Sequence, residues 1–137
     1  MTLATWKSEF YPVEASQVAS EDAIAHSLRK WTGLLSENRK KHHVFLRQGR
    51  RRLFDDIIQN LKDGFWIDKD TCALCTHYYR EEFRGCDDRK CVDCPLHKAL
   101  GGKDCDDDNQ PYVTWLTAGD PQPMIDALKL AAELAAP

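Results

Sequence analysis

Four of the six cysteines in this chain form two Cys-x2-Cys turns, Cys72-Ala73-Leu74-Cys75 and Cys91-Val92-Asp93-Cys94, with fifteen residues between them. Each turn directs two thiols toward one point, and a second turn about 15–20 residues later completes the four ligands that zinc accepts. A site of four thiolates has no open coordination position, so zinc bound there stabilises structure and activates no water. We therefore expect a structural Zn²⁺ held by Cys72, Cys75, Cys91 and Cys94, with further candidate ligands at Cys86, Cys105, His77 and His97.

The cysteine-rich stretch also carries an internal correspondence. Its second half repeats the cysteine spacing of the first with a constant offset of nineteen residues, so that Cys72, Cys75 and Cys86 correspond to Cys91, Cys94 and Cys105. Two similar half-units with six thiolates would hold more than one metal ion, whereas a single site built from the two turns is the simpler interpretation.

Disulfides are the alternative use of these cysteines, and the compartment decides between the two. Residues 1–10 contain Trp6, Lys7 and Glu9 where a signal peptide needs an unbroken apolar run, and no stretch reaches the length of a membrane span. We expect a cytoplasmic protein without membrane contact. In a reducing cytosol, clustered cysteines bind metal more often than they form disulfides.

Hydrophobic periodicity predicts helices near residues 20–36, 50–62 and 121–135, where apolar residues recur at helical spacing. Asp63-Gly64 follows the second of these in the manner of a helix C-terminal cap. The opening segment contains Tyr11-Pro12 and is predicted to be extended or irregular, because proline moves its predecessor away from helical angles.

A chain of 137 residues fits one domain, here residues 1–137. Residues 20–62 form a helical part with a basic connection, residues 65–116 a loop-rich, zinc-stabilised module, and the C-terminal helix completes the domain. The expected fold class is mainly α, or α+β if short strands form around residues 65–67 and 111–116.

The net charge of −3 divides into +4 on residues 1–62 and −7 on residues 63–137. Seven cations and no acid occur between positions 39 and 52: Arg39, Lys40, Lys41, Arg47, Arg50, Arg51 and Arg52. Such a run attracts phosphates, and a guanidinium binds phosphate through two parallel hydrogen bonds. We expect these residues to bind a phosphate-bearing ligand, either a nucleotide or nucleic acid. The alternative is a solvated face that neutralises the acidic cysteine region.

A second hypothesis concerns the acidic residues. Asp87, Asp88 and the run from Asp104 to Asp108 would mimic nucleic-acid charge and occupy a basic surface on a host protein. Calcium binding by an EF-hand is not predicted, because Asn109 and Trp115 stand where that loop requires Gly and Glu. A solvated acidic turn is the simpler interpretation of this run.

A third hypothesis is a zinc-containing nuclease, suggested by His42-His43 beside Asn38 and Arg39. The acidic residue and the second metal-binding side chain of such a site are not apparent. A deaminase is not expected, since no His is followed two residues later by Glu. We therefore assign no catalytic residue and expect a non-enzymatic binding protein; the oligomeric state stays open, a homo-oligomer included.

Taken with Gly101-Gly102, Cys105 and Pro111-Tyr112, the two cysteine turns resemble a pattern of small cysteine-rich bacteriophage proteins over about residues 66–116. Cys86 is additional to that pattern. The resemblance implies a phage protein in the host cell cytoplasm that modulates host machinery or counters host defence by binding, and it assigns no activity to any residue.

Overall fold

The computed structural model describes residues 1–58, 63–83 and 90–136. The protein is mainly helical, with 56% helix, 8% strand and one small sheet, which confirms the expected fold class. The α-helices are α1 (Leu3–Phe10), α2 (Ala23–Gly33), α3 (Ser36–Lys41), α4 (Ala73–Tyr78), α5 (Pro95–Ala99), α6 (Pro111–Ala118) and α7 (Gln122–Ala135). The strands are β1 (Val44–Arg47), β2 (Arg52–Asp55) and β3 (Phe65–Trp66), and the short 3₁₀ turns are η1 (Ala15–Gln17), η2 (Ser20–Asp22), η4 (Lys69–Thr71) and η5 (Glu81–Phe83).

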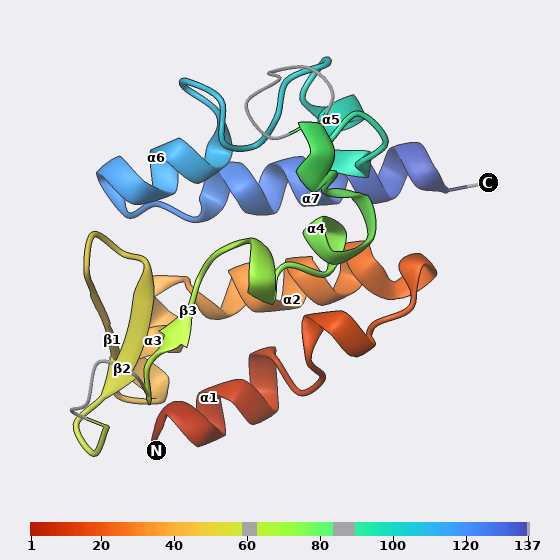
Figure 1. Ribbon diagram of the computed structural model, residues 1–137. Coiled ribbons are helices and arrows are strands. Elements are labelled where there is room, and N and C mark those ends of the chain that lie inside the picture. The colour runs from red at the N-terminus through yellow and green to blue at the C-terminus, as the bar shows by residue number, and fades with distance from the viewer. Residues whose placement is uncertain (59–62, 84–89, 137) are drawn as a thin grey trace.

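Helix α2 runs through the middle of the molecule, with α1 on one side and α7 on the other (Figure 1). Its buried Trp31 meets the ring of Trp115 from α6 edge to face at 5.5 Å. Trp6 of α1 is also fully buried and donates its indole N–H to the Gly33 carbonyl at 2.9 Å. These aromatic residues therefore join α1 and α6 to α2.

Residues 3–10 form helix α1, so the prediction of an extended or irregular opening segment was wrong there. Thr2 and Thr5 exchange hydrogen bonds in a capping box that starts α1. Leu3, Trp6 and Phe10 are its buried residues, at the i, i+3, i+7 spacing of a helix face. Pro12 acts only after this helix has ended.

The predicted helix at 50–62 was also wrong, because residues 52–55 form strand β2 and residues 59–62 lie outside the described part. Leu53 and Phe54 are both 0% exposed, so the strand is buried on both faces and lacks the alternation that reveals a half-buried strand. Between β1 and β2, Gln48, Gly49 and Arg50 all adopt positive φ, which helices exclude.

The sheet has the order β1-β2-β3 and is antiparallel throughout. Gly64 does not cap a helix; it leaves room for the Phe54 ring, which a Cβ at this position would meet at 2.6 Å. The strand predicted at 65–67 is present as β3. The other possible strand, at 111–116, is not formed, because Pro111 starts helix α6, which buries Pro111 and Trp115.

The remaining sequence predictions hold in part. The helix predicted at 20–36 is divided into η2, α2 and the start of α3, while the C-terminal helix forms over Gln122–Ala135. The cysteine module contains α4, α5 and α6 and is thus more helical than predicted. Within the described ranges, none of the helices has the length and apolar character needed to cross a membrane.

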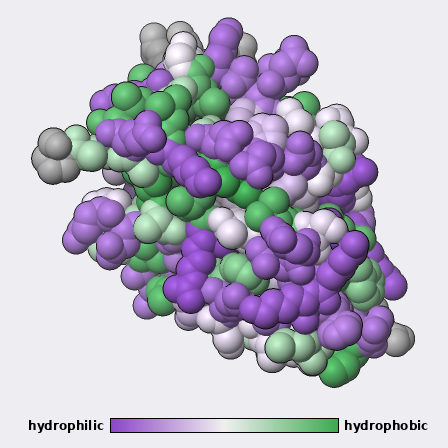
Figure 2. Space-filling model, turned by 180° about the vertical axis from the view of Figure 1, so that it is seen from behind, coloured by the Kyte–Doolittle hydropathy of each residue, from purple (hydrophilic) through white to green (hydrophobic). Residues whose placement is uncertain are grey.

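The surface opposite the view of Figure 1 is largely hydrophilic, with hydrophobic side chains gathered in one area (Figure 2). Leu130 and Leu134 are large apolar side chains that α7 leaves 42% and 59% exposed.

Replacing Gly33 by Ala should destabilise the protein by about 1–3 kcal/mol through overpacking. The new Cβ would lie 2.7 Å from Cβ of Phe10, which α1 holds in place. Urea denaturation of the single variants and of Gly33→Ala combined with Phe10→Ala measures the effect. A Gly33→Ala penalty that persists at full size in the Phe10→Ala background would contradict the proposed clash.

Asp55 links the N-terminus to the end of β2. Its carboxylate is 3% exposed and accepts hydrogen bonds from the backbone N–H groups of Leu3, Ile57 and Ile58 at 2.6, 2.9 and 2.7 Å. Burial raises the pKa of Asp55, but these hydrogen bonds outweigh burial and the pKa is lowered from its ordinary 3.8. The carboxylate thus stabilises the fold above about pH 4, and this contribution is lost as the pH falls through the lowered pKa.

Asp55→Asn should cost about 1–3 kcal/mol at neutral pH, since the amide cannot accept all three hydrogen bonds. The difference from wild type should shrink as the pH falls below 4, which urea melts at several pH values would measure. Asp22→Asn, at an exposed carboxylate without a side-chain capping bond, is the control. A pH-independent penalty at Asp55 would argue against the carboxylate.

Candidate metal centre and ligand cavity

The cysteines of the described chain lie on three segments that meet. Cys72 precedes α4, and its Sγ accepts a hydrogen bond from the backbone N–H of Cys75 at 3.4 Å. Cys94 caps α5, and its backbone N–H donates to the Cys91 carbonyl at 2.9 Å, which closes the second turn. Cys105 lies before α6 and accepts from the Tyr112 N–H at 2.9 Å.

All five of these thiols are free and line one enclosed chamber of about 20 Å³, whose cysteines are Cys72, Cys75, Cys91, Cys94 and Cys105. The two Cys-x2-Cys turns thus face the same space although fifteen residues separate them. Cys105 lines the same chamber from a third segment. The cysteine spacing alone did not decide whether Cys105 belongs to the site. Cys86 lies outside the described residues, so its place in the chamber stays a prediction.

The thiols differ in their affinity for protons. A hydrogen bond from Cys75 lowers the pKa of Cys72 to about 5, with help from the charge of Lys30. The same hydrogen bond, together with burial, raises the pKa of Cys75 well above its ordinary value. Burial raises the pKa of Cys91 to about 12 and that of Cys94 to about 11, and it also raises the pKa of Cys105. Burial therefore favours the neutral form of the thiol at most positions of the chamber.

A thiophilic metal ion suits this set of donors. Four or five sulphur ligands around a space of one water-sized sphere match a single ion better than a large cofactor. Within the described ranges no three thiol sulphurs lie within 4.8 Å of one another, so the chamber would contract around an ion. Zinc held there would cross-link the segments before α4, α5 and α6.

The two candidate histidines differ in position. His97 lines the thiol chamber, and its Nδ1 lies 3.0 Å from Oδ1 of Asp104. The imidazole of His77 instead bonds the Val18 carbonyl through Nε2 at 2.5 Å, and this residue does not line the chamber. The structure therefore retains His97 as a candidate ligand and gives His77 a structural contact.

A larger cavity of about 500 Å³ adjoins the chamber and shares four of its cysteines. Its apolar and aromatic wall comes from α2, α6 and α7 and includes Trp31, Tyr112, Met124 and Leu128. Its charged residues are Lys30, Arg51, Asp68, Lys69 and Asp106. A cavity of this size and mixed character is typical of small-ligand sites.

Lys30 is the buried cation of this cavity, with only 1% of its surface exposed. Its Nζ donates to the Thr71 carbonyl at 3.0 Å and to Thr71 Oγ1 at 3.4 Å. Burial lowers the pKa of Lys30, while the charges of Cys72 and Cys75 oppose this effect. A metal centre with several thiolates would supply the negative charge that a buried ammonium group requires.

The structure does not gather the seven predicted phosphate-binding residues at one point. Most already have partners: Arg39 Nε donates to the Leu34 carbonyl, Arg50 to the Leu116 and Thr117 carbonyls, and Lys41 to Glu9. The guanidinium of Arg47 lies over the rings of Phe45 and Phe54, and that of Arg52 lies 3.6 Å from the Trp66 ring centroid.

Two basic residues differ from the rest. Arg51 lines the ligand cavity, and its guanidinium has no hydrogen bond or ion pair with any described residue. Lys40 is exposed on α3 and does not line this cavity. Arg39, Arg47 and Arg50 border a separate open groove beside Gly119. Most of the basic run therefore contacts other parts of the fold, and Arg51 supplies one uncommitted guanidinium to the cavity.

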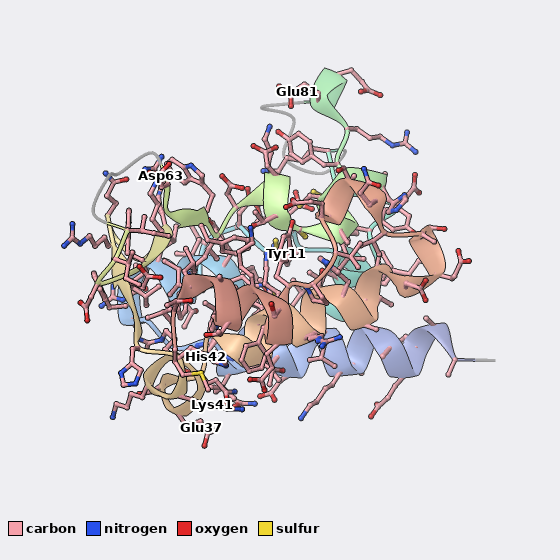
Figure 3. The ribbon with its side chains drawn as sticks, turned by 90° about the horizontal axis from the view of Figure 1, so that it is seen from below. Tyr11, Glu37, Lys41, His42, Asp63 and Glu81 are labelled. Carbon is pink, nitrogen blue, oxygen red and sulfur yellow. The ribbon has the colours of Figure 1, made fainter. Side chains whose placement is uncertain are left out.

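His42, the candidate nuclease residue, is 3% exposed. Its Nδ1 lies 2.9 Å from Thr5 Oγ1 and its Nε2 lies 2.6 Å from Glu9 Oε1. Figure 3 shows it together with Lys41 at the end of α3. With both ring nitrogens bonded inside the fold, His42 has no free nitrogen for a substrate or a metal ion.

The acidic run is only partly solvated. Asp104 is 1% exposed and belongs to the wall of the thiol chamber, while Asp106 pairs with Lys90 at 2.8 Å. The interpretation of a solvated turn was therefore wrong for Asp104. Burial also removes this carboxylate from any surface that would mimic nucleic-acid charge.

Comparison with known proteins adds no assignment to this geometry. No protein-family model, no curated protein and no solved structure matches the chain.

Metal removal should destabilise the protein strongly, because the thiols are spread over three segments that a bound ion would join. Protein purified without chelator should contain about one zinc per chain, and Cys72→Ser should lose it together with several degrees of melting temperature. Binding should weaken as the pH falls, since the high pKa values of the buried thiols mean that an ion must displace protons.

His77→Gln is the matched control, because His77 lies in α4, the helix that Cys72 caps, but does not line the chamber. Its zinc content should equal that of the unaltered protein, measured by elemental analysis alongside free-thiol titration. Oxidised thiols with no bound metal in Cys72→Ser and wild type alike would contradict the metal centre.

Proposed function

We propose that this protein is a non-enzymatic, zinc-stabilised binding protein whose cavity takes a small phosphate-bearing ligand, a nucleotide in particular. The observation that carries the proposal is the free guanidinium of Arg51 at a cavity of about 500 Å³ lined by aromatic rings. Phosphate recognition and base recognition would then occur in one space.

The cavity wall has the chemistry that a nucleobase requires. Trp31 and Tyr112 meet at 6.3 Å with their rings nearly perpendicular, and Met124 and Leu128 of α7 extend the apolar surface. Aromatic rings next to nucleobases contribute through stacking, and sulphur and methyl groups fill the space around them. The hydroxyl of Tyr112 already donates to the Ile67 carbonyl at 2.6 Å, which fixes its ring.

Arg51 supplies the group for the phosphate. Its backbone carbonyl accepts from the Ile67 N–H at 2.8 Å, so β2 and β3 hold the main chain while the side chain keeps its donors. An uncommitted guanidinium binds phosphate in a bidentate manner, which a lysine cannot do. Lys69 is the other cation of this wall that lies outside the core, and it also pairs with Glu81 at 3.3 Å.

The metal centre would provide rigidity in this proposal. Cys72, Cys75, Cys91 and Cys105 border both the chamber and the cavity, so zinc in the chamber would fix one wall of the ligand site. Loss of the ion should therefore weaken ligand binding as well as folding.

The biological setting that we propose is the cytoplasm of a bacterial host, where a phage protein binds a nucleotide signal or nucleic acid and so modulates host machinery or counters host defence. This setting is supported by the cysteine pattern and its resemblance to small phage proteins, together with thiols that are free in the structure. A host protein is the alternative partner.

Arg51→Ala should reduce the affinity for nucleotides about 10- to 100-fold, the loss expected for hydrogen bonds to a charged group. Titration of the zinc-containing protein with ADP and with a cyclic dinucleotide, followed by calorimetry and by tryptophan fluorescence, to which Trp31 of the cavity wall contributes, measures this. Added salt should weaken binding further.

Lys40→Ala is the control, because it removes an exposed cation of the same basic run that lies outside the cavity. Its affinity should match that of wild type. Equal losses in the two variants would indicate attraction by the whole basic run, and no saturable binding of either nucleotide would contradict the proposed ligand class.

A further inference from the structure

We propose that Asp104, Asp106 and Asp107 hold a hard divalent cation, Mg²⁺ or Mn²⁺, between the thiol chamber, which Asp104 lines, and the ligand cavity, which Asp106 lines. Among the His, Cys, Asp and Glu residues that the structure describes, they are the one group of three whose ligand atoms all lie within 4.8 Å of one another. They come from the loop between α5 and α6.

The burial of Asp104 supports a cation site. Its Oδ1 lies 3.0 Å from His97 Nδ1, but its Oδ2 is buried and has no hydrogen-bond partner in the described chain. Buried carboxylate oxygens without a donor are rare in folded proteins, since each has lost its hydration without replacement. A metal ion satisfies such an oxygen directly.

The loop holds the other two carboxylates close to Asp104. The backbone N–H of Asp104 donates to Oδ2 of Asp107 at 2.8 Å, and the N–H of Asp107 donates to the Asp104 carbonyl at 3.1 Å. Asp106 is exposed, so it would leave the cation open to water and to a ligand. Its Oδ2 receives Lys90 Nζ at 2.8 Å, which leaves Oδ1 for the cation.

The donor atoms determine the class of metal. Three carboxylates and water are hard oxygen ligands of the kind that Mg²⁺ and Mn²⁺ prefer, whereas zinc would favour the neighbouring thiols. The two sites are therefore chemically distinct, although Cys105 lies between Asp104 and Asp106 in the sequence.

The position of Asp106 gives the cation a role, and this step rests on the proposed function. Asp106 and Arg51 line the same cavity. Mg²⁺ in proteins is usually bound by one or two carboxylates together with ligand phosphates. A cation at Asp106 would thus contact the phosphate that Arg51 binds, and it would offset the negative charge of Asp68 and Asp106 in the wall.

Mn²⁺ titration of the zinc-containing protein, followed by electron paramagnetic resonance without any nucleotide, tests the site. We expect one saturable Mn²⁺ per chain, and Asp106→Asn should weaken it about tenfold or more, as is usual when a metal ligand is lost. Asp107→Asn should have a similar effect while its amide oxygen still accepts from the Asp104 N–H.

Asp108→Asn is the matched control, because it removes the same charge from the next residue of the loop, which is exposed and outside the group of three. It should leave Mn²⁺ affinity nearly unchanged. Equal weakening by Asp108→Asn and Asp106→Asn, or no saturable Mn²⁺ binding by wild type, overturns the proposal. Circular dichroism and zinc content confirm that each variant is folded.

The ADP titration, repeated with and without Mn²⁺, separates this proposal from the proposed function. Binding of ADP that needs Arg51 but is insensitive to Mn²⁺, with no Mn²⁺ site detected, removes the cation site and leaves the nucleotide cavity. Saturable Mn²⁺ binding that Asp106→Asn weakens, in a protein that binds no nucleotide, supports the cation site and removes the ligand assigned to the cavity.

Discussion

The convergence of thiols from three segments is the arrangement on which the rest of this structure depends. Segments at the starts of α4, α5 and α6 meet at a chamber lined by five free cysteines, and four of these cysteines also line the larger cavity. Neutral thiols contribute little attraction by themselves, whereas thiolates around one ion would bind all three segments together. The shape of the larger cavity therefore depends on the cysteines that it shares with the chamber.

Charge is arranged around the junction in a consistent way. Lys30 is buried beside the thiols, Arg51 is uncommitted at the cavity, and Asp104 is buried with one oxygen unsatisfied. Lys30 and Asp104 are unfavourable without a partner of opposite charge, because burial removes hydration, whereas Arg51 is exposed and keeps its donors available. A thiolate centre, a hard cation and a phosphate are the partners that we propose for Lys30, Asp104 and Arg51, in that order.

Some of these features follow from the sequence because they depend on local spacing. The apolar repeat of α7 predicted its helix, and the Cys-x2-Cys spacing predicted that two pairs of thiols face one point. Other features were misread for equally physical reasons. β2 is buried on both faces and so lacks strand alternation, and Pro111 could signal either a strand edge or a helix start. The capping box of Thr2 and the spacing of Trp6 and Phe10 were available signals for α1.

The sequence by itself determined that this chain is mainly helical, carries a cluster of thiols suited to a metal ion, and has a dense basic run before it. Only the tertiary structure decided which of those basic residues keep their charge free, because the partners of Arg50 and Lys41 lie on α6 and α1, far away in the sequence. It also decided that Cys105 and Asp104 join the chamber and that His42 does not reach a ligand. Spacing along the chain fixes local geometry, whereas burial and partners depend on contacts between distant segments.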